Sequence, residues 1–308
     1  MYRRPHAQLP KFTYFRRMAS RLLYLLILKP ISLLPHWALY RVSDFVYLLF
    51  ITVFPYRKKV VLGNIQRCFP EKSRAEHASI LKKFYRHLAD VFVETFKNFS
   101  ISLKQVNERM PCTNPELLND LAARGKSIVI TGGHYNNWEL YALAAAGCFT
   151  GRTMAIYKKI KDPYFDALMR RTRGKFGLEL VPTREASDWM RANANDRIAS
   201  IYAIDQSPAD PKKGLWLPFL NQNTLCHYGA EKHAREYEQA VVYGHIKKVR
   251  RGYYTLTYEL LAEDVSDLPK GEVIRRANAA LEGDILAAPE FWLWSHKRWK
   301  HCQPANEQ

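Results

Sequence analysis

Residues 127–140 of this chain read SIVITGGHYNNWEL, a strand-like run followed by a helix-like one. Residues 128–131 are mostly apolar and favour extended backbone, which predicts a short buried strand. Two glycines follow, and they interrupt the strand because glycine tolerates backbone angles that other residues avoid. Asn136 or Asn137 can then act as the N-cap of a helix. The stretch therefore predicts a strand, a glycine turn and a helix, with His134 in the turn.

The spacing of His134 and Glu139 indicates a histidine–acid pair. On a continuous α-helix two residues five apart would point roughly 140° away from each other. They can meet if His134 lies in the non-helical segment before the helix and folds back over the first turn. The carboxylate would then accept the Nδ1–H of the imidazole and leave Nε2 free as a general base. No nucleophile accompanies the pair, so the nucleophile is expected to arrive with the substrate. Taken alone, this spacing is also compatible with an incidental pairing.

The composition bounds the class of protein. The chain has 308 residues, enough for one large domain or two and for a sizeable core. Its apolar content of 47% and aromatic content of 13% exclude a disordered chain. The formal net charge of +18 predicts a polyanionic neighbour, which can be nucleic acid, an anionic membrane, or an acidic carrier or substrate. The five cysteines are scattered without a C-x2-C pair, which argues against a disulfide framework and against a zinc site.

The N-terminal region is basic and then apolar. The apolar part spans residues 22–54, and its longer uninterrupted run, residues 36–54, carries Arg41 and Asp44, so it is a poor free-standing membrane span. We interpret residues 1–55 as a basic N-terminus and a membrane anchor, either one imperfect span or a pair of interfacial helices. A helical hairpin buried in a soluble protein is the alternative. Anionic lipid is favoured over nucleic acid by the basic residues on both sides of the apolar region: Arg16, Arg17, Arg21, Arg57, Lys58 and Lys59.

Residues 56–308 are predicted to form an α/β domain. Ser73 and Glu76 form a capping-box pattern for a helix that extends to about residue 98. An apolar stripe at helical spacing is expected to face the core: Ile80, Phe84, Leu88, Val91 and Phe92. Further along, strands are predicted at residues 154–157, 178–182, 198–204, 241–245 and 253–258, with helices at 163–173, 184–193 and 271–283.

This alternation is typical of a central, mostly parallel sheet covered by helices. Asp205 and Gln206 follow the strand at residues 198–204, and they are expected on the same edge of the sheet as His134. A simple strand-to-loop turn is the alternative for these two polar residues.

Five stretches, in this order along the chain, resemble the late lipid A acyltransferases, the lauroyl and myristoyl transferases within the lysophospholipid and glycerolipid acyltransferase superfamily. They cover nearly the whole chain, which makes the set far more specific than any one of them. The stretches are residues 56–70 (YRKKVV…NI…FP), 133–139 (GHYNNWE), 157–177 (YK…DP…R…G), 203–219 (AIDQ…LPF) and 292–300 (WLWSHKRWK).

The resemblance implies a glycerolipid-acyltransferase-like fold and transfer of a fatty acyl group from an acyl thioester to a hydroxyl of a lipid A precursor. It implies that His134 is the general base and that Glu139 orients it. Arg173 matches the arginine of the family that serves a substrate phosphate or the oxyanion, and Asp205 and Gln206 would shape the acceptor site. The family often has Tyr-Arg-Pro where this chain has Tyr-Lys-Lys, so Lys158 would bind phosphate as a point charge.

The expected partners follow from the same resemblance. The donor would be acyl-acyl carrier protein, or acyl-CoA, and the acceptor would be a lipid in an anionic membrane surface. Neither a metal, a bound cofactor nor nucleic acid is expected. The resemblance implies a location at the cell inner membrane, with the catalytic domain facing the cytoplasm.

Three other functions are left open. The same chemistry can act on a lysophospholipid, a glycolipid or an aminolipid. A hydrolase could use His134 and Glu139 to activate water, and it would release free fatty acid. A nucleic-acid-binding protein should carry basic residues clustered on one face among aromatics, whereas here the charge flanks apolar helices and motifs. Trp292, Trp294 and Trp299 are expected to pack in the core, with interfacial anchoring as the alternative.

Overall fold

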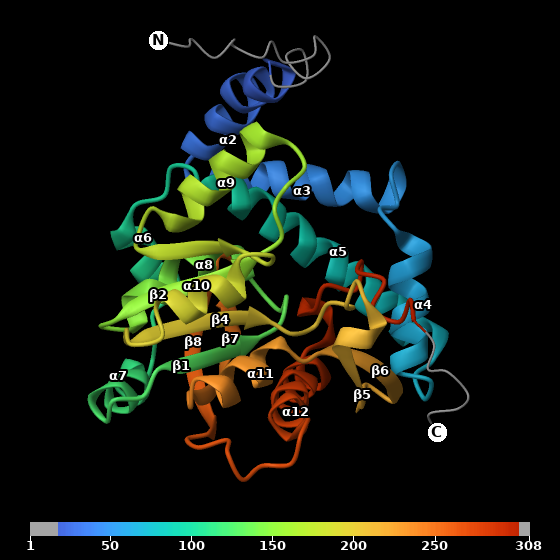
Figure 1. The fold of residues 1–308 in the computed structure, drawn as a ribbon. Coiled ribbons are helices and arrows are strands. Elements are labelled where there is room, and N and C mark those ends of the chain that lie inside the picture. Colours follow the sequence, from blue (N-terminus) through green and yellow to red (C-terminus); the bar gives the residue numbers. More distant parts are fainter. Residues whose placement is uncertain (1–17, 302–308) are drawn as a thin grey trace, which may run out of the picture.

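A computed structural model describes residues 18–301. The strands of its central sheet are β1 (Ile128–Gly132), β2 (Arg152–Tyr157), β3 (Leu178–Pro182), β4 (Ile198–Ala203), β7 (Ala240–Arg250) and β8 (Tyr253–Ala262). They are arranged in the order β3-β2-β4-β1-β7-β8 (Figure 1). β1 is parallel to both β4 and β7, β2 is parallel to β3 and β4, and β8 runs antiparallel to β7. The prediction of a mixed α/β fold with a mostly parallel sheet is confirmed.

Alternate residues of the central strands supply two separate cores. Val129 and Val241 pack with α11 (Gly229–Glu236) and α12 (Glu272–Ala287), which lie below the sheet in Figure 1. Ile128, Ile130 and Val242 pack with α6 (Leu103–Arg109), α7 (Pro115–Ala123) and α8 (Trp138–Ala144). Side chains alternate along a strand, so a sheet covered on both faces needs apolar residues at every position. That requirement explains the continuous apolar run at the start of β1.

The long helix α5 (Arg74–Lys97) begins with the predicted capping box, because Ser73 and Glu76 each accept the backbone N–H of the other. Its buried stripe contains Ile80 and Phe84, as predicted. The prediction is wrong for Phe92, which is 49% exposed. Val91, which is buried, directly precedes it, and neighbouring helical residues point about 100° apart.

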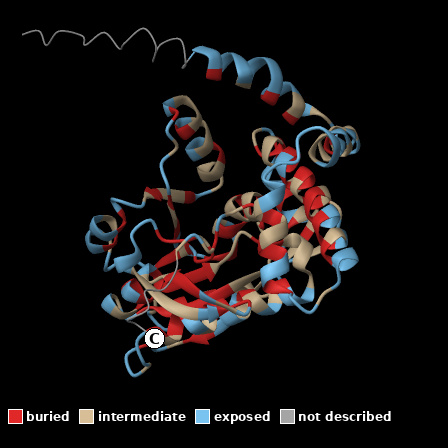
Figure 2. Cartoon of the chain, turned by 90° about the vertical axis from the view of Figure 1, so that its right-hand side faces the viewer, coloured by how far each residue is buried: buried red, intermediate tan, exposed pale blue. Residues whose placement is uncertain are grey.

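The N-terminal region consists of short helices rather than one long one. Pro35 separates the turn η1 (Tyr24–Leu28) and α2 (Lys29–Leu33) from α3 (His36–Thr52), and α4 (Lys58–Cys68) follows. Within residues 18–301, no helix is both long enough and apolar enough to cross a membrane. Much of η1 and α2 is exposed, and these helices project from the body of the molecule (Figure 2). α3 instead packs along α5.

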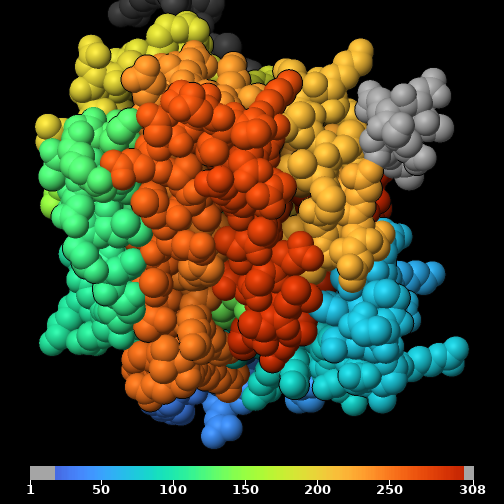
Figure 3. Space-filling model, turned by 90° about the horizontal axis from the view of Figure 1, so that it is seen from below, coloured from blue at the N-terminus to red at the C-terminus, as the bar shows by residue number. Residues whose placement is uncertain are grey.

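The remaining elements complete the edges of the fold. The helices α9 (Pro163–Gly174) and α10 (Ala186–Ala192) pack beside β3. A hairpin that the sequence did not predict, β5 (Gly214–Phe219) and β6 (Gln222–His227), forms a separate two-stranded sheet. It lies next to α12 on the underside of the molecule, where Figure 3 shows it in gold. The short turns are η2 (Ala145–Cys148), η3 (Pro211–Lys213) and η4 (Pro289–Phe291).

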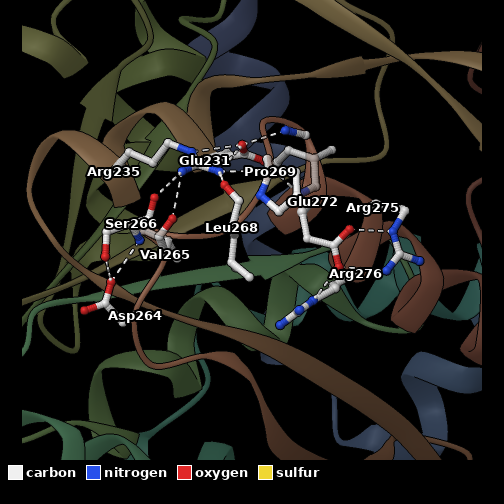
Figure 4. A network of polar contacts seen from close by, with 12 residues as sticks. Glu231, Arg235, Asp264, Val265, Ser266, Leu268, Pro269, Glu272, Arg275 and Arg276 are labelled. Carbon is white, nitrogen blue, oxygen red and sulfur yellow. Dashed lines mark hydrogen bonds and ion pairs between the residues drawn. The ribbon is translucent and has the colours of Figure 1, made fainter.

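A polar network fixes the loop between β8 and α12 (Figure 4). Glu231 on α11 is fully buried, and it accepts the backbone N–H of Gly271 at 2.7 Å and of Ile274 at 3.3 Å. Its other partner is Arg235, which also donates to the carbonyls of Val265, Leu268 and Pro269. The carboxylate therefore caps the N-terminus of α12 and holds that helix against α11.

Candidate active site

The site forms where β1 and β4 end side by side. Gly132 pairs with Ala203, and the backbone N–H of Ile204 donates to the carbonyl of Gly132 at 2.9 Å. The turn after β1 lies close to α12: a Cβ at Gly133 would come within 2.7 Å of a methyl group of Leu281. Only glycine fits there without displacing that side chain. The sheet thus brings His134 and Asp205 to one edge, as the sequence predicted.

One carboxylate holds His134 at two points. Asp205 Oδ1 accepts from the ring Nδ1 at 2.7 Å, and Oδ2 accepts from the backbone N–H of the same histidine at 2.8 Å. The indole Nε1–H of Trp292 also donates to Oδ2, at 2.9 Å. Asp205 is 3% exposed, whereas the His134 side chain is 21% exposed and can be reached from outside. The histidine is therefore fixed in orientation while part of its side chain stays exposed.

The two pKa values in this pair shift in opposite directions. Burial alone would raise the pKa of Asp205, but the charge and hydrogen bonds of His134 outweigh it and hold that pKa at about 2. Burial would lower the pKa of His134, but Asp205 outweighs it and raises the pKa above its ordinary value. An ionised Asp205 can only accept, so Nδ1 must carry the proton in either charge state of the ring. Neutral His134 consequently presents the lone pair of Nε2.

Gln206 lies against that lone pair. Its Nε2 is 3.3 Å from Nε2 of His134, so the amide N–H can donate to the neutral imidazole. A glutamine side chain also carries a carbonyl oxygen, which could accept from an imidazolium after a rotation of the amide. Gln206 can therefore satisfy both protonation states of the ring.

Glu139 does not make the contact that the sequence predicted. The Nδ1 of His134 contacts Asp205 instead, and Glu139 forms a two-pronged ion pair with Arg173 on α9. The distances are 3.0 Å from Arg173 Nε to Oε2 and 2.7 Å from Nη2 to Oε1. The reason is local: Asn137 caps α8, so Glu139 lies in its first turn, and α8 packs against α9. Both charges act on the histidine: that of Glu139 raises the pKa of His134, and that of Arg173 lowers it.

Lys158 is the candidate that the structure does not bring to this cluster. It follows β2 directly and is exposed, and within residues 18–301 it makes no hydrogen bond or ion pair. It shares the carboxyl edge of the sheet with His134, because β2 and β1 both lie parallel to β4.

The C-terminal segment lies across the turn of His134, a role that the sequence did not predict. The backbone of Leu293 donates to the carbonyl of His134 at 3.1 Å, and Asn136 donates to that of Phe291 at 2.9 Å. Trp292 and Trp294 are 2% and 0% exposed, so packing is the correct reading and interfacial anchoring is wrong for both. The bond from Trp292 to Asp205 had no signal in the sequence beyond the tryptophan-rich motif itself.

The arrangement can remove a proton from a hydroxyl group or from water at Nε2 of His134, and it can place a guanidinium nearby. Among the described residues, no group of three or more His, Cys, Asp or Glu side chains has an arrangement that could hold a metal ion.

Comparisons with known proteins agree on one family. The model of the family described as "Bacterial lipid A biosynthesis acyltransferase" matches residues 7–301. The lipid A biosynthesis lauroyltransferase of Escherichia coli (strain K12) is 22% identical over 271 residues, which is 87% of each chain. The lipid A biosynthesis palmitoleoyltransferase of the same strain is 21% identical over 253 residues, 82% of this chain and 81% of the relative. A lipid A biosynthesis acyltransferase of Shigella flexneri matches to the same extent.

Proposed function

Since this chain belongs to the bacterial lipid A biosynthesis acyltransferase family, we propose that it transfers a fatty acyl group from an acyl thioester to a hydroxyl of a lipid A precursor. The observation that supports this reaction best is the His134–Asp205 pair, which orients an imidazole whose side chain is 21% exposed. The acceptor hydroxyl would replace the amide of Gln206 at Nε2. Among the described residues, the hydrogen-bond partners of the His134 ring are Asp205 and Gln206 and include no Ser, Thr or Cys side chain, which suits a substrate hydroxyl as the attacking group.

In the proposed mechanism, Nε2 of His134 takes the proton of the acceptor hydroxyl. The oxygen attacks the thioester carbonyl and forms a tetrahedral oxyanion, which needs hydrogen-bond donors nearby. Asp205 stabilises the imidazolium that forms, because it stays ionised beside Nδ1. The intermediate then expels the thiolate, which takes the proton back from His134 and leaves as a thiol. The products are an ester and a free thiol, and the charges balance.

We assign Glu139 and Arg173 a joint role beside the base. Glu139 holds the guanidinium through two of its N–H groups, which leaves the others to donate to the oxyanion or to a substrate phosphate. Glu139 would thus act by positioning Arg173 rather than by orienting His134. We place Gln206 on the acceptor side of the site, and the exposed Lys158, which lies apart from the cluster on the same edge of the sheet, would offer a positive charge to a substrate phosphate.

The partners are proposed from charge and surface chemistry. The net charge of +18 suits an acidic acyl carrier protein as donor, with acyl-CoA as the alternative donor, and an anionic bilayer that contains the acceptor. Exposed apolar side chains on the N-terminal helices include Leu26, Trp37 and Phe45, at 70%, 73% and 61% exposure. We therefore propose that residues 1–55 associate with the cytoplasmic face of the inner membrane and that residues 56–308 form the acyltransferase domain.

The proposed function is tested by lipid mass spectrometry of a host strain that carries the wild type, His134→Ala or the control His301→Ala. Within the described residues, the ring of His301 makes one hydrogen bond, to the carbonyl of Pro208, and none to His134 or Asp205. We expect one acyl chain to disappear from lipid A with His134→Ala and to be retained with the control. A change confined to phospholipids or aminolipids would mean that the acceptor is one of those lipids and not a lipid A precursor. Release of free fatty acid by the purified protein without any acceptor would indicate a hydrolase instead.

A further inference from the structure

Helix α5 carries a buried carboxylate that the proposed reaction does not use. Glu94 is 6% exposed and accepts three hydrogen bonds from three different parts of the chain. The side-chain amide of Asn137 donates to Oε2 at 2.5 Å, and the hydroxyl of Tyr254 on β8 donates to the same oxygen at 2.9 Å. The hydroxyl of Tyr40 on α3 donates to Oε1 at 2.8 Å. Glu94 therefore connects α3, β8 and the start of α8.

Asn137 is the partner closest to the chemistry. It lies between His134 and Glu139 in the chain and is fully buried. Its Oδ1 accepts the backbone N–H of Leu140 at 2.8 Å, which caps α8, while its Nδ2 donates to Glu94. An asparagine amide can face either way, and the bond to Glu94 fixes the orientation in which the oxygen caps the helix. The geometry of the catalytic turn thus depends on a residue about forty positions earlier in the sequence.

We propose that Glu94 is a positioning residue for acyl transfer, which holds Asn137 and through it the turn of His134 and the first turn of α8. This proposal rests on the proposed function. The bond from Tyr40 joins the same carboxylate to α3, the helix that exposes Trp37 and Phe45. A chain of hydrogen bonds, Tyr40–Glu94–Asn137, therefore connects the apolar N-terminal surface with the catalytic turn. Burial and the neighbouring Asp90 raise the pKa of Glu94, and the hydroxyls of Tyr40 and Tyr254 oppose that rise.

The test exchanges the donor and the acceptor of the hydrogen bond between Asn137 and Glu94. Asn137→Asp keeps an oxygen for the helix cap but places a carboxylate against Glu94. When Glu94→Gln is added, the amide at position 94 can donate to the carboxylate at position 137, so the hydrogen bond is restored in the opposite direction. With an acyl-acyl carrier protein donor and a lipid A precursor acceptor, we expect kcat of Asn137→Asp to fall about 10²-fold, since small displacements of catalytic groups are costly, with KM nearly unchanged. The double variant should regain most of the lost kcat.

Two variants on α3 supply the matched control. Tyr40→Phe removes the bond to Glu94, and Ser43→Ala removes a similar bond from Ser43 to Asp90, which is 2.7 Å long and lies one turn earlier on α5. Each should lower the free energy of unfolding in urea by a similar amount. Only Tyr40→Phe should lower kcat, by roughly fivefold for one net hydrogen bond.

Three outcomes are decisive. Wild-type kcat in Asn137→Asp would overturn the proposal, as would a double variant that regains stability without regaining kcat. If the wild type itself transfers no acyl group, the proposed function fails and the catalytic role of Glu94 fails with it. In that case urea unfolding of Asn137→Asp, of Glu94→Gln and of the double variant would still measure the interaction between these two side chains.

Discussion

At the scale of single residues, the two hydrogen bonds from His134 to Asp205 determine which ring nitrogen of the histidine carries the proton. The ring Nδ1 and the backbone N–H of the histidine both donate to one buried carboxylate, and Trp292 supplies a third donor. Because the charge and hydrogen bonds of His134 hold the pKa of Asp205 at about 2, the carboxylate is ionised at neutral pH. The negative charge raises the pKa of His134, and only the neutral ring can accept a proton.

Asp205→Asn should therefore change both the rate and its pH dependence. The amide has the right shape but cannot accept all three donors, and it cannot stabilise an imidazolium by charge. We expect kcat to fall by up to about 10⁴-fold, the size of the loss when the acid partner of a catalytic histidine is neutralised in a catalytic triad. Activity requires neutral His134 and so rises as the pH passes its pKa. Loss of the Asp205 charge should move this rise to lower pH in a profile of kcat/KM. A rise at unchanged pH would contradict the assignment of His134 as the base.

Glu139 and Arg173 should shift the titration of His134 in opposite directions. Glu139 raises the pKa of His134 and Arg173 lowers it, so Glu139→Gln should lower that pKa and Arg173→Met should raise it. The measurement is an NMR titration of the His134 ring in the free protein, which needs no activity. Shifts of the same sign would show that the pair acts on the ring through a structural change instead. Arg173→Met should in addition slow transfer by about 10²-fold if the guanidinium stabilises the oxyanion.

The sequence predicted that His134 and Asp205 lie close together, but it did not predict which carboxylate contacts the His134 ring. His134 and Asp205 each follow a short apolar strand, and parallel strands end at one edge, so their proximity follows from the pattern. The choice of Asp205 over Glu139 as the partner of Nδ1 does not. It depends on the path of a turn in which Asn136 has a φ of 52°, and on the packing of α8 against α9. No local signal in the sequence reports either.

At the scale of elements, the sequence predicted the strands of the central sheet but not the hairpin of β5 and β6. The prediction for β3 matches its observed bounds, because a run of mostly apolar residues follows a glycine. The hairpin of β5 and β6 was missed because its two-residue turn is Leu220-Asn221, both at positive φ, rather than the Asn-Gly pair that usually indicates such a turn. Leucine tolerates this backbone poorly, and tertiary packing must hold it there: Leu220 is 1% exposed.

The cap on α12 gives a prediction about stability. Glu231 is fully buried and serves two backbone N–H groups and Arg235, so Glu231→Gln leaves a buried donor facing other donors (Figure 4). We expect the free energy of unfolding in urea to fall by about 1–3 kcal/mol. The control is Glu263→Gln, which removes an exposed ion pair with Arg124 and should cost less than about 1 kcal/mol. Equal losses in the two variants would mean that the cap contributes nothing beyond surface charge.

At the scale of the whole molecule, exposed apolar side chains and positive charge are combined near the N-terminus. Trp37, Phe45 and Leu48 share the outer side of α3, at 73%, 61% and 52% exposure. The helix is fixed to the body through Ser43 and through Asp44, which pairs with Arg86 and Arg251. A largely apolar helix held in this way can insert its exposed side into a bilayer without unfolding, while neighbouring arginines and lysines attract anionic lipid.

Binding to vesicles that contain anionic phospholipid should therefore depend on α3. Each fully buried large side chain contributes about 1.5–3 kcal/mol, so the single change Phe45→Ser should weaken binding by about tenfold or more. The matched control is Leu286→Ser, since Leu286 is 56% exposed on α12, on the opposite side of the molecule from α3 in Figure 1. Added salt should weaken both variants and the wild type alike, because it screens the electrostatic part of binding only. If Phe45→Ser binds as tightly as the wild type, and salt abolishes all binding, then charge alone holds the protein at the membrane and α3 does not insert.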